Sequence, residues 1–248
     1  MMNEMLRVTA RQILGRRRTL IMVLLALVPV ALALLFRLGG GGPASLVGDR
    51  EFLRSVLDAF LVTLLLPLIA LLVGTAAFGA EIEDGTVVYL LAKPIPRWRT
   101  VLAKLLVASA GTIVLAGAAT FATVAIAVAD ATGWTEILAG YLVGVAAGAV
   151  IYCSAFVALS LVTGRALIAG LLYVVLWEGV LANLLKGIRF LSIRQYTLGI
   201  ADVAGVHGRI TPDTLDAAPA IALGAIVTVL ASLVAVRRLQ GFEIPQED

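Results

Sequence analysis

Six long apolar runs, separated by short charged segments, dominate the pattern of this chain. Each run is long enough for the roughly 20 apolar residues that a membrane-crossing helix needs. The pattern therefore predicts an all-α integral membrane protein with a single transmembrane domain over residues 1–248. The six transmembrane helices are expected at about 19–38, 57–80, 104–129, 137–164, 166–185 and 217–236.

The polar interruptions add detail to this outline. Pro67 predicts a kink in the second span, because proline removes a backbone donor, and a charged cluster ending at Asp58 precedes that span. The external loop 186–216 mixes charged and apolar residues in runs too short to cross a bilayer. This mixture predicts re-entrant helices that dip into the outer interface.

The first 18 residues form a basic amphipathic segment. One predicted helical stripe is apolar, and Arg7 and Arg11 lie on another. This favours an N-terminal elbow helix, residues 1–18, lying in the membrane interface. A signal peptide is the competing interpretation, but Thr19 to Phe36 is uncharged for 18 residues, which exceeds the usual apolar region of about 7–15 residues. We expect a retained span.

Composition and charge agree with a membrane protein. Hydrophobic residues make up 61% of the chain and charged residues 14%, whereas soluble domains are roughly 45–50% apolar. The net charge of +3 comes from short basic clusters at the ends of apolar runs, so no nucleic-acid partner is expected. If both termini are cytoplasmic, 12 of the 19 basic residues lie on the cytoplasmic side, as the positive-inside rule favours. We therefore expect a multi-pass cell-membrane protein in this orientation. The 12 residues are Arg7, Arg11, Arg16, Arg17, Arg18, Lys93, Arg97, Arg99, Lys104, Arg165, Arg237 and Arg238.

The longest highly charged segment between two apolar runs is residues 81–104. It starts with acids, continues through Gly85-Thr86 and a Leu90-Leu91 pair, and reaches a basic stretch after Pro94 and Pro96. Apolar residues at helical spacing predict one or two turns of amphipathic helix that the prolines end. Without further information, such a segment is a solvated hairpin between two membrane helices.

The order of residues in this segment resembles the first cytoplasmic loop of type-2 ABC exporter permeases. In that family the loop reads Glu-x-Glu-x-Gly-Thr, then Leu-Leu, then Pro-x-x-Arg and Gly-Lys or Ala-Lys; Ala103 stands here where glycine is more frequent. The resemblance implies that the coupling loop 81–103 and Lys104 dock on an ABC ATPase. The implied docking residues are Glu81, Glu83, Asp84, Gly85, Thr86, Leu90, Leu91, Pro94, Arg97 and Lys104.

The same resemblance implies an assembly. The chain contains no Gly-x-x-x-x-Gly-Lys-Ser/Thr motif, so the resemblance implies that ATP and Mg are bound by a partner ATPase and that this subunit carries no cofactor. A second copy of the permease, or a paralogue, would complete the complex in the lipid bilayer. The expected function is ATP-driven export of a substrate that the apolar spans do not identify.

Other function classes find less support in the residues. A single cysteine, Cys153, and a single histidine, His207, allow neither a disulfide nor a Cys/His metal cluster within one chain. An intramembrane enzyme needs paired ionisable groups, and the spans offer only Glu178. We therefore predict no catalytic residues and no metal site. A membrane anchor or mechanotransmitting subunit of an ABC-type complex remains an alternative.

Two features within the spans are candidates for a pathway or an interface. Glu178 is ionisable and lies in an apolar run, which favours a functional role, although Lys186 and Arg189 follow closely and favour a position near the interface. Gly140, Gly144 and Gly148 form a ridge of small residues in the fourth span. Such a ridge allows close helix approach, either between two copies or within one chain.

Overall fold

Helices make up the regular structure of the described part of the chain. The computed structural model describes residues 16–39, 55–83, 96–128, 134–181, 190–204 and 214–241, and no strand occurs among them. This confirms the all-α prediction at the level of fold class. The elements are α2 (Arg16–Leu38), η1 (Ser55–Leu65), α4 (Leu66–Glu83), α6 (Arg97–Val128), α7 (Trp134–Val162), α8 (Ala166–Leu172), η2 (Tyr173–Leu181), α10 (Ile193–Ala204) and α11 (Ala217–Gln240), where η denotes a π-helix.

In the described residues, five helices are long and apolar enough to cross a membrane. They are Arg18–Leu38, Ser55–Gly79, Arg97–Ala127, Trp134–Val162 and Ala217–Gln240, and each overlaps a predicted span. The predicted span 166–185 is represented by the shorter apolar helix Ala166–Leu181. Its rise of at most about 24 Å is less than the roughly 30 Å hydrocarbon core, so length alone does not make it a sixth span.

Two helices extend into the predicted coupling loop from either side. α4 continues to Glu83, and α6 already begins at Arg97. The backbone N–H of Arg99 donates to the carbonyl of Pro96 at 2.9 Å, as expected for a proline just before the first helical turn. Residues 84–95 of the predicted loop, and residues 1–15 of the predicted elbow, lie outside the described residues.

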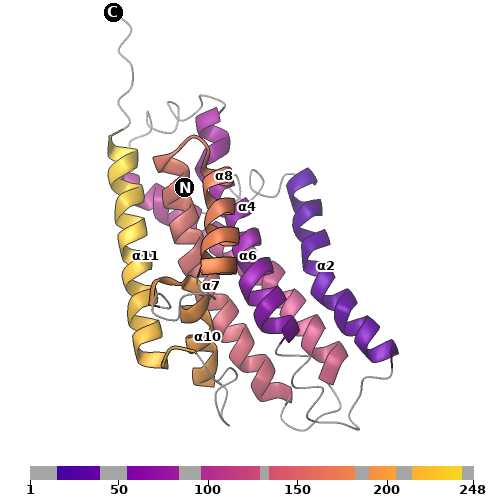
Figure 1. Cartoon of the computed structure of the whole chain (residues 1–248). Helices are drawn as coiled ribbons and strands as arrows, with labels where there is room; N and C mark the ends of the chain where they lie inside the picture. The colour runs from indigo at the N-terminus through magenta and orange to yellow at the C-terminus, as the bar shows by residue number, and fades with distance from the viewer. Residues whose placement is uncertain are drawn as a thin grey trace, which may run out of the picture.

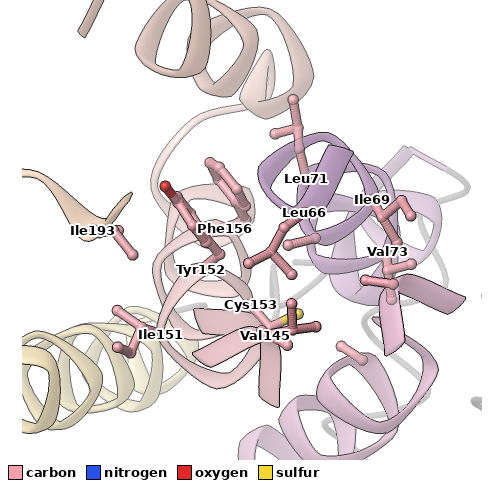
Figure 2. Packing of buried hydrophobic residues seen from close by; sticks show 14 of the residues in the cluster. Leu66, Ile69, Leu71, Val73, Val145, Ile151, Tyr152, Cys153, Phe156 and Ile193 are labelled. Atoms are coloured by element: carbon pink, nitrogen blue, oxygen red, sulfur yellow. The ribbon is translucent and has the colours of Figure 1, made fainter. Parts of the chain in front are cut away.

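Helix α7 is the centre of the bundle. It packs against α4, α6, α10 and α11, with α11 and α2 at opposite sides of the molecule (Figure 1). In Figure 2, Tyr152 and Phe156 of α7 lie beside Leu66 and Leu71 of α4. Only 17% of the most apolar stretch of α2, and the same share of α11, is buried inside the chain. Their outward leucines and valines suit contact with lipid.

Pro67 lies where the helix type changes. η1 is π-helical up to Leu65, and the α-helical α4 begins at Leu66. Because proline has no N–H, it cannot complete the regular hydrogen-bond ladder at this point. The change from π- to α-helix thus coincides with Pro67, and the kink expected in the second span stays a prediction.

Candidate functional site

The start of α6 lies against the end of α4, where the predicted coupling loop leaves and re-enters the bundle. Lys104 is only 3% exposed. Its Nζ lies 2.6 Å from Oε2 of Glu81, donates to the carbonyl of Ala77, and sits 4.2 Å from the ring centre of Phe78. The ion pair and the bond to Ala77 therefore hold the two ends of the loop together.

The same end of α6 also holds the end of α11. Nη1 of Arg97 donates to the carbonyls of Leu239 at 3.1 Å and Gln240 at 2.6 Å. These carbonyls lie in the last turn of α11 and have no partner within their own helix. We call the place where α4 ends, α6 begins and α11 ends the loop end of the bundle. Beside it, the exposed Arg99 lies 5.2 Å from the ring centre of Trp98.

The predicted docking residues divide into two groups. Glu81, Arg97 and Lys104 lie together at the loop end, where each contacts another part of the chain. These three residues form the base from which the loop emerges. The side chain of Glu83 and the remaining predicted docking residues lie outside the described part of the structure: Asp84, Gly85, Thr86, Leu90, Leu91 and Pro94.

A second polar site surrounds Glu178, which is fully enclosed by the chain at 0% exposure. Its Oε1 accepts hydrogen bonds from the hydroxyl of Tyr173 at 2.8 Å and from the backbone N–H of Ile193 at 2.8 Å. A longer bond comes from the N–H of Arg194 at 3.4 Å. Oε2 accepts from the hydroxyl of Ser192 at 2.5 Å. The carboxylate is thus bound by donors from two separate segments.

The π-helical turn explains why Tyr173 reaches Glu178. Residues five apart point about 140° away from each other around an α-helix, whereas a π-helix closes its turn with i to i+5 contacts. η2 therefore brings these two side chains onto one face. π-Helical turns are found frequently at functional sites.

Glu178 lies at the buried start of α10. Ser192 and Gln195 have the spacing of a capping box, Ser-x-x-Gln, a signal in the sequence that could have located this helix start. The N–H of Gln195 donates to the Ser192 carbonyl at 3.1 Å, and that of Tyr196 to the same carbonyl at 3.4 Å. With Ile193 and Arg194 bound to Glu178, the first four N–H groups of α10 all have acceptors.

Tyr196 of α10 also lies near Glu178. Its burial and the nearby negative charge of Glu178 raise the pKa of its hydroxyl. The hydroxyl therefore stays protonated at neutral pH and donates to the carbonyl of Phe190. This bond holds the residues just before α10 against the helix.

The chain was compared with models of known protein families. The model of the ABC-2 family transporter protein matches residues 7–237, which is nearly the whole chain. The chain belongs to the ABC-2 transporter permease family. Comparison with curated proteins finds no significant match. The predicted resemblance is confirmed, and the chain is a multi-pass transmembrane permease whose family implies an ABC ATPase partner and is generally not catalytic itself.

In this permease, part of the glycine ridge is filled by α10. A Cβ added at Gly144 would lie 2.7 Å from Cβ of Ala201 and 2.8 Å from the carbonyl of Thr197. A Cβ at Gly148 would lie 2.5 Å from Oγ1 of Thr197. Gly140, one helical turn earlier, is also buried. Of the two uses left open by the sequence, the structure places Gly144 and Gly148 in contacts within the chain.

The permease also buries Asp58, which the sequence pattern grouped with the loop before the second span. Asp58 is 6% exposed within η1, and the hydroxyl of Tyr141 on α7 donates to its Oδ1 at 2.6 Å. The apolar residues on both sides of it, Leu57 and Leu61, were the available signal that the helix begins earlier. Among the described residues, no group of three or more His, Cys, Asp or Glu is placed to hold a metal ion.

Proposed function

We propose that this chain is the transmembrane subunit of an ATP-driven ABC exporter, coupled through residues 81–104 to a separate ATPase subunit. ATP and Mg bind on that partner. Closure of the ATPase on ATP moves the coupling loop and alternates access to a pathway formed with a second copy of the permease or a paralogue. In this scheme ATP shifts a two-state equilibrium because it binds one conformation more tightly.

The arrangement of the loop end is the observation that supports this proposal most strongly. Lys104 joins α6 to α4 through Glu81, and Arg97 joins α6 to α11 through Gln240. A force on the loop between α4 and α6 would therefore act on three helices together. Coupling needs such a rigid base, because a loop on independently moving helices would dissipate the motion.

The proposal includes the finer topology. We assign six membrane crossings to one domain over residues 1–248, with an elbow at 1–18, both termini cytoplasmic and export as the direction. Ala166–Leu181 serves as most of the fifth crossing. α10, buried against α7 and α11, is the re-entrant helix of the external segment 186–216. The unequal distribution of basic residues supports this orientation.

Co-purification of the ATPase with permease variants tests the proposal. Leu90→Ala combined with Leu91→Ala removes the apolar contact expected in the ATPase groove, so association should weaken about tenfold or more. Glu83→Lys should have the same effect, because it reverses the charge where α4 passes into the coupling loop.

The matched control truncates two exposed apolar residues of α6 that lie outside the loop. Leu106→Ala with Val114→Ala, at residues 56% and 68% exposed, should leave co-purification unchanged. Full retention of the ATPase and of transport in the Leu90/Leu91 and Glu83 variants, at matched expression, would show that the segment is only a solvated turn.

A further inference from the structure

The site around Glu178 joins two segments that the chain separates. Trp177 in η2 donates through Nε1 to the carbonyl of Leu191 at 3.2 Å. The next residue, Glu178, binds Ser192 and the first two N–H groups of α10. Two successive residues of η2, Trp177 and Glu178, are therefore hydrogen-bonded to successive residues at the start of α10, beginning at Leu191.

The start of α10 requires such acceptors because it is buried. Ser192 is 0% exposed and Ile193 is 5% exposed, so water is not at hand to accept from the first helical N–H groups. An unbonded buried N–H costs about 1–3 kcal/mol. A carboxylate is the strongest available acceptor, and its negative charge also matches the positive end of the helix dipole.

The two oxygens of Glu178 have different partners. The backbone N–H groups of Ile193 and Arg194, which cannot become acceptors, both donate to Oε1. Oε2 is bound by the hydroxyl of Ser192, and a hydroxyl can donate or accept. The contact therefore requires an acceptor oxygen at the position of Oε1.

Close packing fixes α10 on its other faces. Gly144 and Gly148 of α7 leave room for Thr197 and Ala201. On the α11 side, a Cβ added at Gly199 would lie 2.8 Å from Cβ of Ala220. Side-chain packing therefore holds the middle of α10 between α7 and α11, and the polar site decides whether its first turn stays in place.

We propose that Glu178 is a positioning residue whose carboxyl group anchors the first turn of α10 to η2, so that α8, η2 and α10 behave as one body. Nothing in the proposed ATPase coupling is required for this inference, because none of the described residues of segment 81–104, at 81–83 and 96–104, takes part in the contact. Its failure and the failure of the proposed function are therefore distinguishable.

Hydrogen exchange of the purified permease in lipid nanodiscs, followed by mass spectrometry, tests the anchor. Glu178→Leu keeps the approximate volume but removes the acceptor, so peptides covering the start of α10 should exchange about tenfold faster or more. Peptides of α7 should not change. Glu136→Leu is the matched control, since this acid in the first turn of α7 lies outside the site. Exchange of α10 in Glu178→Leu equal to that of the wild type would overturn the proposal.

Two further variants test the acceptor itself and cover a failure to fold. Glu178→Gln keeps an acceptor oxygen, so its α10 exchange should lie between that of the wild type and Glu178→Leu; exchange equal to Glu178→Leu would overturn the role of the acceptor. If Glu178→Leu does not fold, Ser192→Ala carries the test by removing the capping hydroxyl, and an unchanged α10 would refute the anchor. ATPase co-purification should remain normal in every folded variant, whereas the Leu90/Leu91 variant loses it.

Discussion

The loop end and the Glu178 site place opposite charges against opposite ends of helices. At the loop end, Arg97 donates to carbonyls in the last turn of α11, while Lys104 donates to Ala77, six residues before the end of α4. At the second site, Glu178 accepts from the first N–H groups of α10. The end of α11 and the start of α10 are thus each satisfied by a side chain from another element.

The sites differ in the partners of their charged groups. Lys104 is paired with Glu81, a full opposite charge, whereas Glu178 is bound by hydroxyl groups and backbone N–H groups. Removing one member of a buried ion pair leaves a buried charge behind. Loss of Lys104 should therefore have the largest effect on stability, followed by changes at the slot for α10 and at Arg97.

The largest effect is expected for Lys104→Met. The substitution leaves the carboxylate of Glu81 without its buried cation and should destabilise the permease by about 3–5 kcal/mol. Denaturant unfolding of the detergent-solubilised protein measures the loss. The double variant Lys104→Met with Glu81→Gln should recover much of it, because no charge then remains unpaired. A single variant as stable as the wild type would contradict the assigned ion pair.

An intermediate effect is expected at the slot that receives α10. Gly144→Ala places a methyl group against Ala201 and the backbone carbonyl of Thr197, and should cost about 1–3 kcal/mol. Gly111→Ala is the control, because nothing lies within 4 Å of the added Cβ there; it should be neutral or stabilise α6 by about 0.5–1 kcal/mol. Equal stability of the two variants would show that the contact with α10 is not close.

The smallest effect is expected for Arg97→Ala. Arg97 is only partly buried, so water can replace its bonds to Leu239 and Gln240, and the loss should be about 1 kcal/mol. The same unfolding measurement on Arg99→Ala, whose guanidinium lies over the exposed Trp98, provides the comparison. A loss at Arg97 as large as that at Lys104 would mean that the two cations are equally shielded.

The predictions that the structure confirms concern features set by neighbouring residues in the sequence. The apolar runs predicted five helices that the structure has at nearly the same residues, because a span is defined by its own length and hydrophobicity. Helix ends were less well predicted. Arg97 and Arg99 were expected in the coupling loop and are helical, because Pro96 permits a helix to start immediately after it.

The candidate sites were only partly predictable. Asp58 was grouped with a loop because it is charged, and its acceptance of a hydrogen bond from Tyr141 depends on a residue 83 positions away. The sequence singled out Glu178 as an ionisable residue in an apolar run. Its partners at the start of α10 lie 14 to 16 positions further along the chain, so the sequence did not show that they bind it. The capping-box spacing of Ser192 and Gln195 predicts a helix start but not which acid binds it.

The sequence by itself determined that this chain is an all-helical membrane permease, because hydrophobic length and the residue order of segment 81–104 are properties of contiguous residues. The tertiary structure alone decided how the buried charges are used. Arg97 reaches a carbonyl 143 positions away, Lys104 turns inward to α4, and Glu178 faces the first turn of α10. A buried charge must find a partner in space, and only the packing of α4, α10 and α11 brings those partners within reach.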